Sequence, residues 1–494
     1  MTEIKSYLAV VWCFFETLLF GGLIYGWGSL VFILIDEGVY SDLCEHIPVN
    51  LTSNISLVSN SSLTKTNCEG QDSMLTLVFT VASFLFCAGC AAMGQINYKF
   101  GTRITRIISF LLFELGALLI AFVSPSVPWL IFPGLTLIGV GGIPLLITNT
   151  QISNLFQRGS STIVGLICGA FDGSSGVQLL VKIGYENGFS RQNSYFVLVG
   201  LHTLVLVSTF VFLPKGFIPK PQSIEISEVE YEKENNIHLT QIENSTETDD
   251  ADEVSFKLVK KEKLSMMEEK KLPSLKSCLF SSTYILHVVW VCVLQLRFYY
   301  YIATLNPWLN KLLHADHSQV SYFTNVSMYL LILGVVTSPL AGMVYDLCKM
   351  ISTGSRSELR RDLLPAVPPL IIGSCLGLLA SVLVLVPSTE ILYVLFITVT
   401  VFRSFLYSVA AAFLSAMFPS EYFGLLYGWM VIAAGIFSFF QFPLFKWSES
   451  TNFTQVNVFL LCFLFISLIH PFYQWWRCRK AESSLLIEEN KTDN

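Results

Sequence analysis

Ionisable and hydrogen-bonding side chains occur inside several strongly apolar stretches of this chain. Asp172, followed by Gly173, Ser174 and Ser175, lies in the middle of one such stretch, and Glu16 lies in another. A charge inside an apolar helix is costly, and it usually pairs with another group or lines a solute pathway. We therefore predict a solute-binding site built from Asp172, Asn149, Gln151, Ser174, Ser175, Gln295, Tyr299, Tyr300, Arg403, Tyr407 and Glu16.

These residues also have purely structural interpretations. Glu16 could pair with a basic residue such as Arg403 and lock the helices together. Gln151 follows Thr148 by three residues, so both lie on one helical face that could bond to a neighbouring helix. The tyrosines near position 300 could simply fill space. Asp172 has the fewest structural explanations, because it is an acid beside glycine and two serines in mid-helix.

The composition predicts that these polar groups lie within a membrane. Hydrophobic residues make up 53% of the chain, charged residues make up 13%, and the mean hydropathy is +0.60. A bilayer core needs roughly 20 apolar residues per helix, and runs of that length recur throughout the sequence. We predict an all-α polytopic membrane protein with about 12 transmembrane helices, at 8–35, 73–97, 104–124, 129–156, 162–184, 194–213, 284–310, 319–344, 365–387, 392–418, 423–446 and 455–476. The first run is too long for a signal peptide, so we expect it to remain as the first helix.

The distribution of lysine and arginine predicts the orientation and the division of the chain. An even number of spans with both termini in the cytoplasm puts most short-loop basic residues inside, as the positive-inside rule requires. These residues are Lys99, Arg103, Arg106, Arg158, Lys349, Arg356, Arg360, Arg361, Arg477, Arg479 and Lys480. We therefore expect a six-helix bundle over 1–213, a cytoplasmic linker over 214–281, a second six-helix bundle over 282–476 and a cytoplasmic tail over 477–494.

The first outer loop, 36–72, has the composition of an extracellular segment. It holds three glycosylation acceptors, Asn50, Asn54 and Asn60, and Asn452 is a further acceptor in another outer loop. Asn325 also matches the acceptor pattern, but it falls within a span and should stay unmodified. Cys44 and Cys68 flank the three sequons and could form a disulfide on this oxidising side. No spacing of cysteine and histidine predicts a metal site, and no cofactor or enzymatic activity is expected.

Two bundles of six helices joined by a cytoplasmic tether describe the major facilitator architecture, whose binding site lies near the midplane between the halves. That architecture carries a Gly-x-x-x-Asp turn after its second and eighth spans. The second copy is intact here, from Gly342 to Asp346. The first copy begins at Gly94 and has Tyr98 where the aspartate should stand, so that copy lacks the carboxylate for a charged gating contact.

Longer segments resemble solute carrier family 43 over nearly the whole chain. They are 26–32 (GWGSLVF), 146–156 (LITNTQISNLF), 169–175 (GAFDGSS), 403–407 (RSFLY) and 418–424 (FPSEYFG). The resemblance implies a facilitative transporter, either of large neutral amino acids or of nucleobases. The stretch at Asp172 is similar to the nucleobase branch, whose amino-acid siblings have an uncharged small residue there.

The polar groups can be weighed against each class of substrate. An amino acid needs paired recognition of a carboxylate and an ammonium group, whereas a purine is flat and neutral and needs aromatic faces and edge hydrogen bonds. The tyrosines, the amides and Asp172 favour a purine nucleobase such as adenine, guanine or hypoxanthine. We therefore expect a sodium-independent plasma-membrane carrier that contacts its substrate and the lipid bilayer but no nucleic acid. A carrier of large neutral amino acids and a membrane receptor or sensor on a transporter scaffold remain the alternatives.

Overall fold

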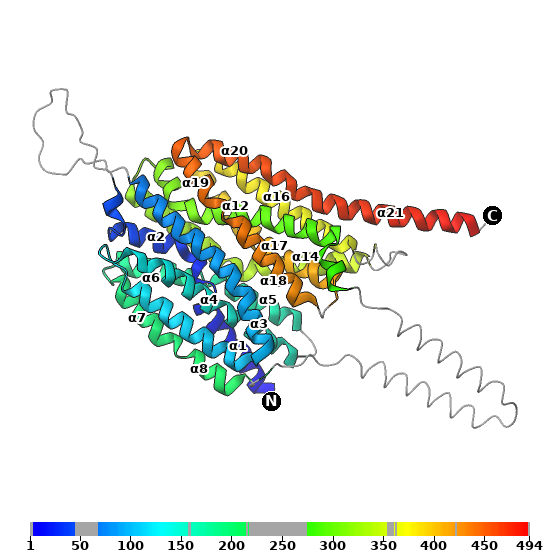
Figure 1. Ribbon diagram of the computed structural model, residues 1–494, viewed down its shortest axis with the longest axis horizontal. Coiled ribbons are helices and arrows are strands. Elements are labelled where there is room, and N and C mark those ends of the chain that lie inside the picture. Colours follow the sequence, from blue (N-terminus) through cyan, green and yellow to red (C-terminus); the bar gives the residue numbers. More distant parts are fainter. Residues whose placement is uncertain are drawn as a thin grey trace, which may run out of the picture.

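The computed structural model describes residues 3–44, 68–156, 160–213, 216, 274–352, 360, 363–419 and 422–492. All regular elements in this part of the chain are helices, which form one bundle with two halves (Figure 1). The sequons at Asn50, Asn54 and Asn60, and nearly all of the linker, lie outside the described residues. The all-α class predicted from composition is therefore confirmed.

The first half, coloured blue to green in Figure 1, is formed by short and long helices that alternate with tight breaks. Its helices are α1 (Glu3–Phe20), η1 (Leu23–Gly26), α2 (Trp27–Asp36), η2 (Ser41–Leu43), α3 (Glu69–Ala121), η3 (Pro128–Leu130), α4 (Ile131–Asn149), η4 (Thr150–Leu155), α5 (Ser160–Gly173), α6 (Gly176–Glu186), α7 (Arg191–His202), α8 (Val205–Val207) and the π-helical turn η5 (Ser208–Phe212).

The second half, coloured green to red, begins at Leu275, inside the range 214–281 that we expected for the linker. Its helices are α11 (Leu275–Leu279), α12 (Ser282–Leu312), α13 (His317–Ile332), α14 (Gly334–Ser352), η6 (Leu364–Ala366), α16 (Val367–Val384), α17 (Thr389–Met417), α18 (Phe423–Ser438), α19 (Gln441–Ser450), α20 (Phe453–Leu464), η8 (Phe465–Leu468) and α21 (Ile469–Thr492).

Local sequence explains where several of these helices begin. The first turn of a helix leaves backbone N–H groups without partners, and a side-chain oxygen just before it can accept them. Ser190 caps α7 in this way, Ser281 caps α12, Asp316 caps α13 and Asn452 caps α20. Apolar runs then continue each helix, so span positions follow directly from the sequence.

Nine helical segments within the described residues are long and apolar enough to cross a membrane, and the number rises to eleven if each of two bent pairs is one span. One of the nine, α3, is two helices joined at Gly101, whose positive φ of 79° breaks the helical backbone there. The predicted span 73–97 lies in α3, and the predicted span 104–124 lies in α3 up to Ala121, so all twelve predicted spans correspond to helices in the structure.

The expected turns at the two Gly-x-x-x-Asp copies are wrong. Gly94 and Tyr98 lie inside α3, and Gly342 lies inside α14. In the first copy the chain breaks seven residues after Gly94, at Gly101, because glycine adopts the required positive φ without a steric penalty.

The glycine-rich stretch of the first span breaks the helix, as expected for such a sequence. α1 and α2 meet at an angle of 42° across Gly21 and Gly22. A side chain on Gly142 of α4 would come within 2.0 Å of the Gly21 carbonyl oxygen, so α4 packs directly on the broken backbone. The amide of Gly22 is satisfied by Ser174 Oγ at 2.6 Å.

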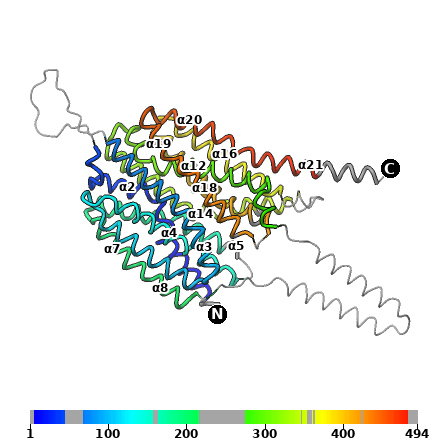
Figure 2. Tube along the Cα trace, viewed as in Figure 1, coloured from blue at the N-terminus to red at the C-terminus, as the bar shows by residue number. Residues whose placement is uncertain are grey.

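The two halves meet along extended helix pairs. α5 of the first half lies beside α14 of the second half, and α3 lies beside α18. Figure 2 shows the same course as a tube, with the blue-to-green half below the green-to-red half. At the crossing of α5 and α14, a side chain on Gly334 would meet Asp172 Cβ at 2.8 Å. The glycine therefore lets the C-terminal half approach Asp172 closely.

Candidate substrate site between the two halves

Asp172 and Arg403 form an ion pair that joins the two halves. Asp172 Oδ1 on α5 lies 3.1 Å from Arg403 Nη2 on α17, and Arg403 Nη1 donates to the Asp172 carbonyl oxygen at 3.1 Å. Ser338 Oγ of α14 donates to Asp172 Oδ2. Asp172 is 7% exposed and Arg403 is 2% exposed. Both lie near the middle of their spans, so a charged contact is held at the centre of the membrane region.

Aromatic rings surround this ion pair. The Arg403 guanidinium carbon lies 4.2 Å from the ring centroid of Tyr25, which comes from the break between α1 and α2. The Tyr25 ring also contacts Phe298 and Tyr407, with centroid distances of 6.0 and 6.5 Å. A guanidinium over a tyrosine face is attracted by the ring quadrupole. The site therefore combines one acid, one base and several flat apolar faces.

Two polar side chains of α12, Tyr299 and Gln295, extend the site. Tyr299 Oη lies 3.5 Å from Tyr25 Oη and 3.6 Å from Cys87 Sγ of α3. Gln295 Nε2, one helical turn away, donates to Ser438 Oγ at 3.3 Å and lies 3.7 Å from Cys87 Sγ. Gln295, Tyr299 and Tyr407 are thus brought to the same seam as Asp172 and Arg403.

The two serines after Asp172 shape the backbone. Ser174 Oγ accepts from the Gly22 amide and donates to the Phe171 carbonyl oxygen at 2.6 Å. Ser175 Oγ donates to the Asp172 carbonyl oxygen at 3.3 Å. Both serines are fully buried. They stabilise the break between α5 and α6, which places the Asp172 carboxylate toward the second half.

Glu16 and Asn149 lie in a different network, inside the first half. Arg106 Nη2 donates to Glu16 Oε1, and Arg106 Nη1 donates to Asn149 Oδ1 at 2.8 Å and to Thr148 Oγ1 at 2.9 Å. Ser208 Oγ also donates to Glu16. The suggested pairing of Glu16 with Arg403 is therefore wrong. Arg106, which we placed among the basic residues of a cytoplasmic loop, is fully buried in α3.

The two remaining candidates also lie away from the ion pair. Gln151 Oε1 accepts from Thr102 Oγ1 at 3.1 Å, within the first half. Tyr300 is buried and lines a small void inside the second half. The structure thus gathers Asp172, Arg403, Gln295, Tyr299 and Tyr407, and it adds three residues absent from our set: Tyr25, Phe298 and Ser338.

The seam is closed by polar contacts at the end of the bundle that carries the first loop, where Cys44 and Cys68 form a disulfide. We call this the disulfide end. Lys182 Nζ of α6 donates to Ser321 Oγ and Asn325 Oδ1 of α13, both at 2.7 Å, and lies 3.2 Å from Glu186. Asn325, the sequon within a span, is therefore bonded to the opposite half.

Lys182 is expected to hold the disulfide end closed. Hydrogen bonds to a charged group contribute about 1.5–3 kcal/mol, so Lys182→Ala should increase opening roughly tenfold or more. The readout is the rate at which a membrane-impermeant maleimide labels a cysteine introduced at Ser29, which is fully buried in α2. Lys446→Ala is the matched control, because Lys446 pairs with Glu449 within its own half. Equal labelling in Lys182→Ala and the parent chain would contradict this role.

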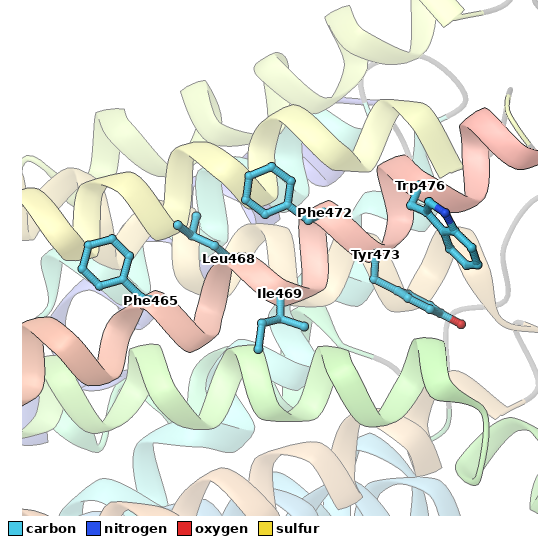
Figure 3. A pocket seen from close by; sticks show the side chains of 6 residues that line it. All are labelled: Phe465, Leu468, Ile469, Phe472, Tyr473 and Trp476. Carbon is cyan, nitrogen blue, oxygen red and sulfur yellow. The ribbon is translucent and has the colours of Figure 1, made fainter.

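A separate surface pocket of about 570 Å³ lies on η8 and α21 (Figure 3). Its lining side chains, drawn in Figure 3, are Phe465, Leu468, Ile469, Phe472, Tyr473 and Trp476. Phe465, Ile469 and Phe472 are more than half exposed. Such a surface is typical of a helix that faces lipid. It offers no charged group to select a polar solute.

The match to a known protein family identifies the family of this chain. Residues 49–442 match the family model for the Major Facilitator Superfamily. The chain belongs to this superfamily. It is therefore a transporter and not an enzyme.

Individual relatives agree with that assignment. The chain is 33% identical over 486 residues to equilibrative nucleobase transporter 1 of Bos taurus, and the match covers 95% of each protein. It is 24% identical to large neutral amino acids transporter small subunit 3 of Homo sapiens, over 93% of this chain and 91% of that protein. The resemblance drawn from short segments is confirmed by these full-length matches.

A solved structure supports the fold alone. A mutant of the peptide transporter POT, in complex with sulfate, superposes with a TM-score of 0.58 at 12% identity and covers 94% of both chains. The predicted major facilitator fold is therefore confirmed. At this identity the likeness carries no information about substrate.

Proposed function

We propose that this chain is a facilitative, sodium-independent carrier of purine nucleobases such as adenine, guanine and hypoxanthine. The observation that carries the proposal is the Asp172–Arg403 pair between the halves, with the Tyr25 ring on the guanidinium. The name of the bovine relative, which shares a third of its residues with this chain, points to the same class of substrate.

The chemistry of a purine matches these groups. Its edge carries N–H donors beside ring-nitrogen or carbonyl acceptors, so a carboxylate and a guanidinium side by side can read two adjacent positions. Asp172 would accept an N–H, and Arg403 would donate to the neighbouring acceptor. Arg403 Nε has no hydrogen-bond partner among the described residues and is available as a donor. The rings of Tyr25, Phe298 and Tyr407 supply the stacking faces.

The position of the Asp172–Arg403 pair between the two halves is suited to transport by alternating access. Asp172 belongs to the first half and Arg403 to the second half. A solute bound between them would therefore contact both halves, and its binding would depend on how the halves are placed. Substrate would replace the ion pair at the centre while Lys182 and Asn325 release or close the disulfide end. Because the substrate is neutral, no sodium ion or proton needs to move with it.

The same proposal includes an orientation. We place the disulfide end and the sequon-bearing loop outside the plasma membrane and both termini in the cytoplasm, with 214–281 as a cytoplasmic linker between the bundles. Asn452 caps α20 from this outer end and is exposed, which suits its proposed glycosylation with Asn50, Asn54 and Asn60.

Uptake of radiolabelled adenine over short times, by cells that express the chain, tests this function. We expect saturable uptake that persists when sodium is replaced by choline, that excess hypoxanthine blocks and that excess leucine leaves unchanged. Cells that express Asp172→Ala at equal surface density are the matched control. Complete inhibition by leucine together with none by hypoxanthine would overturn the nucleobase assignment.

A carrier of large neutral amino acids is the second candidate, and one observation favours it. An acid and a base at 3.1 Å also match the ammonium and carboxylate groups of a zwitterion. The leucine arm of the same experiment separates the two. A sensor would bind adenine without saturable flux in proteoliposomes.

A further inference from the structure

Arg297 differs from the other deeply buried arginines among the described residues. Arg106, Arg191 and Arg403 are at most 3% exposed, and each contacts a carboxylate: Glu16, Glu37 and Asp172 respectively. Arg297 is 2% exposed. Its Nε donates to Ser381 Oγ at 2.7 Å, which is a neutral hydroxyl rather than a carboxylate.

A small void lies against this guanidinium. Its volume is about 10 Å³, and it is lined by Arg297, Tyr300, Tyr301, Thr304, Leu305, Trp308, Val384, Phe453 and Asn457. None of these residues is acidic. Three buried polar atoms of its lining residues, Arg297 Nη2, Tyr300 Oη and Asn457 Oδ1, have no hydrogen-bond partner in the described part of the chain. A void of this size holds one water-sized species.

The void is separate from the proposed substrate site. It lies within the second half, between α12, the end of α16 and the start of α20. Gln295 and Tyr299 leave α12 toward the seam between the halves, and Arg297 lies about 200° around the helix from each. A ligand here would therefore not compete with a solute at Asp172.

The positive charge of Arg297 favours an anion over a neutral water molecule in the void. An isolated buried cation loses much of its hydration, and a neutral water recovers only part of that loss. A monovalent anion next to the guanidinium is attracted more strongly in this buried surrounding than it would be in water. Tyr300 Oη can donate to the anion from the same wall, while Asn457 Nδ2 stays on the Phe453 carbonyl oxygen at 2.8 Å.

We propose that this void binds one small monovalent anion, with chloride as the physiological candidate. The anion takes the place of the carboxylate that the other three buried arginines have. It stabilises the packing of α12 against α16 and α20, and hence the helix that carries Gln295 and Tyr299. This inference does not depend on the identity of the transported solute.

Thermal unfolding of the purified full-length protein tests the proposal. We expect the midpoint to be several degrees higher in sodium chloride or bromide than in sodium gluconate of equal ionic strength, with a saturable dependence on halide. Asn457→Asp supplies an internal carboxylate opposite Arg297. It should therefore unfold at the same elevated temperature in both salts.

Arg297→Gln should lose the difference between the salts, whereas Arg477→Gln, which removes a charge that contacts Thr283 instead, should keep it. If Arg297→Gln does not fold, Asn457→Asp still decides the matter. Identical midpoints of the wild-type protein in halide and gluconate would overturn the proposal. So would a high-resolution map of crystals in bromide that shows a water, without anomalous signal, in the void.

Discussion

Replacing Asp172 with asparagine and Arg403 with glutamine in the same chain is expected to reduce adenine uptake at least tenfold while the protein still reaches the cell surface. The double variant removes both charges together, so no buried ion is left without a partner. A hydrogen bond to a charged group contributes about 1.5–3 kcal/mol, which corresponds to roughly 10- to 150-fold in rate or affinity. The measurement is uptake normalised to surface protein.

The two single variants separate recognition from folding. Asp172→Asn leaves the Arg403 cation buried without its carboxylate, so it should lower both uptake and thermal stability. Ser338→Ala is an intermediate variant, because it removes a hydroxyl bonded to Asp172 Oδ2 and keeps the ion pair. It should lower uptake less than the double variant does. Wild-type uptake by the double variant would remove Asp172 and Arg403 from the substrate site.

Arg106→Gln should have the largest effect on stability of any single change in the first half. Arg106 donates to Glu16, Thr148, Asn149, Ser208 and Thr209, and these residues come from α1, α4 and η5. Without the guanidinium, Glu16 becomes a buried charge without a cation. Breaking a buried ion pair in this way costs about 3–5 kcal/mol. We expect a lower unfolding midpoint in detergent and little protein at the cell surface.

A double variant tests whether the unpaired Glu16 charge causes this loss of stability. Glu16→Gln combined with Arg106→Gln should recover part of the lost stability, because the uncompensated charge is gone. Arg103→Gln, three residues away and less buried, should change the midpoint little. If Arg106→Gln unfolds at the wild-type temperature yet fails to transport, then Glu16 and Asn149 belong to the substrate pathway, as the sequence alone suggested.

The sequence predicts the spans well, because the bilayer imposes a simple requirement on each of them separately. A helix that crosses it must be apolar over roughly 20 residues, and that property is local. The turn expected at Gly94 was not predictable in this way, since glycine permits a positive φ without requiring it, and the helix breaks at Gly101 instead.

The candidate site was only half predictable. Asp172 and Arg403 were recognisable as costly charges in apolar runs, but they are separated by 231 residues, and no local pattern joins them. Glu16 carried the same signal as Asp172, yet it is neutralised inside one half. Tyr25 gave no signal at all, because an aromatic residue in an apolar helix is ordinary.

The sequence by itself thus determined the membrane class, the helices, the division into two halves and the set of buried polar residues. Only the tertiary structure decided which of those residues meet. It assigned Glu16 to Arg106 within one half and Asp172 to Arg403 between the halves. Among the described residues it left Arg297 without a carboxylate. The physical reason is that apolarity is a property of each helix, whereas the compensation of a buried charge depends on the side chains that neighbouring helices bring within about 3–4 Å.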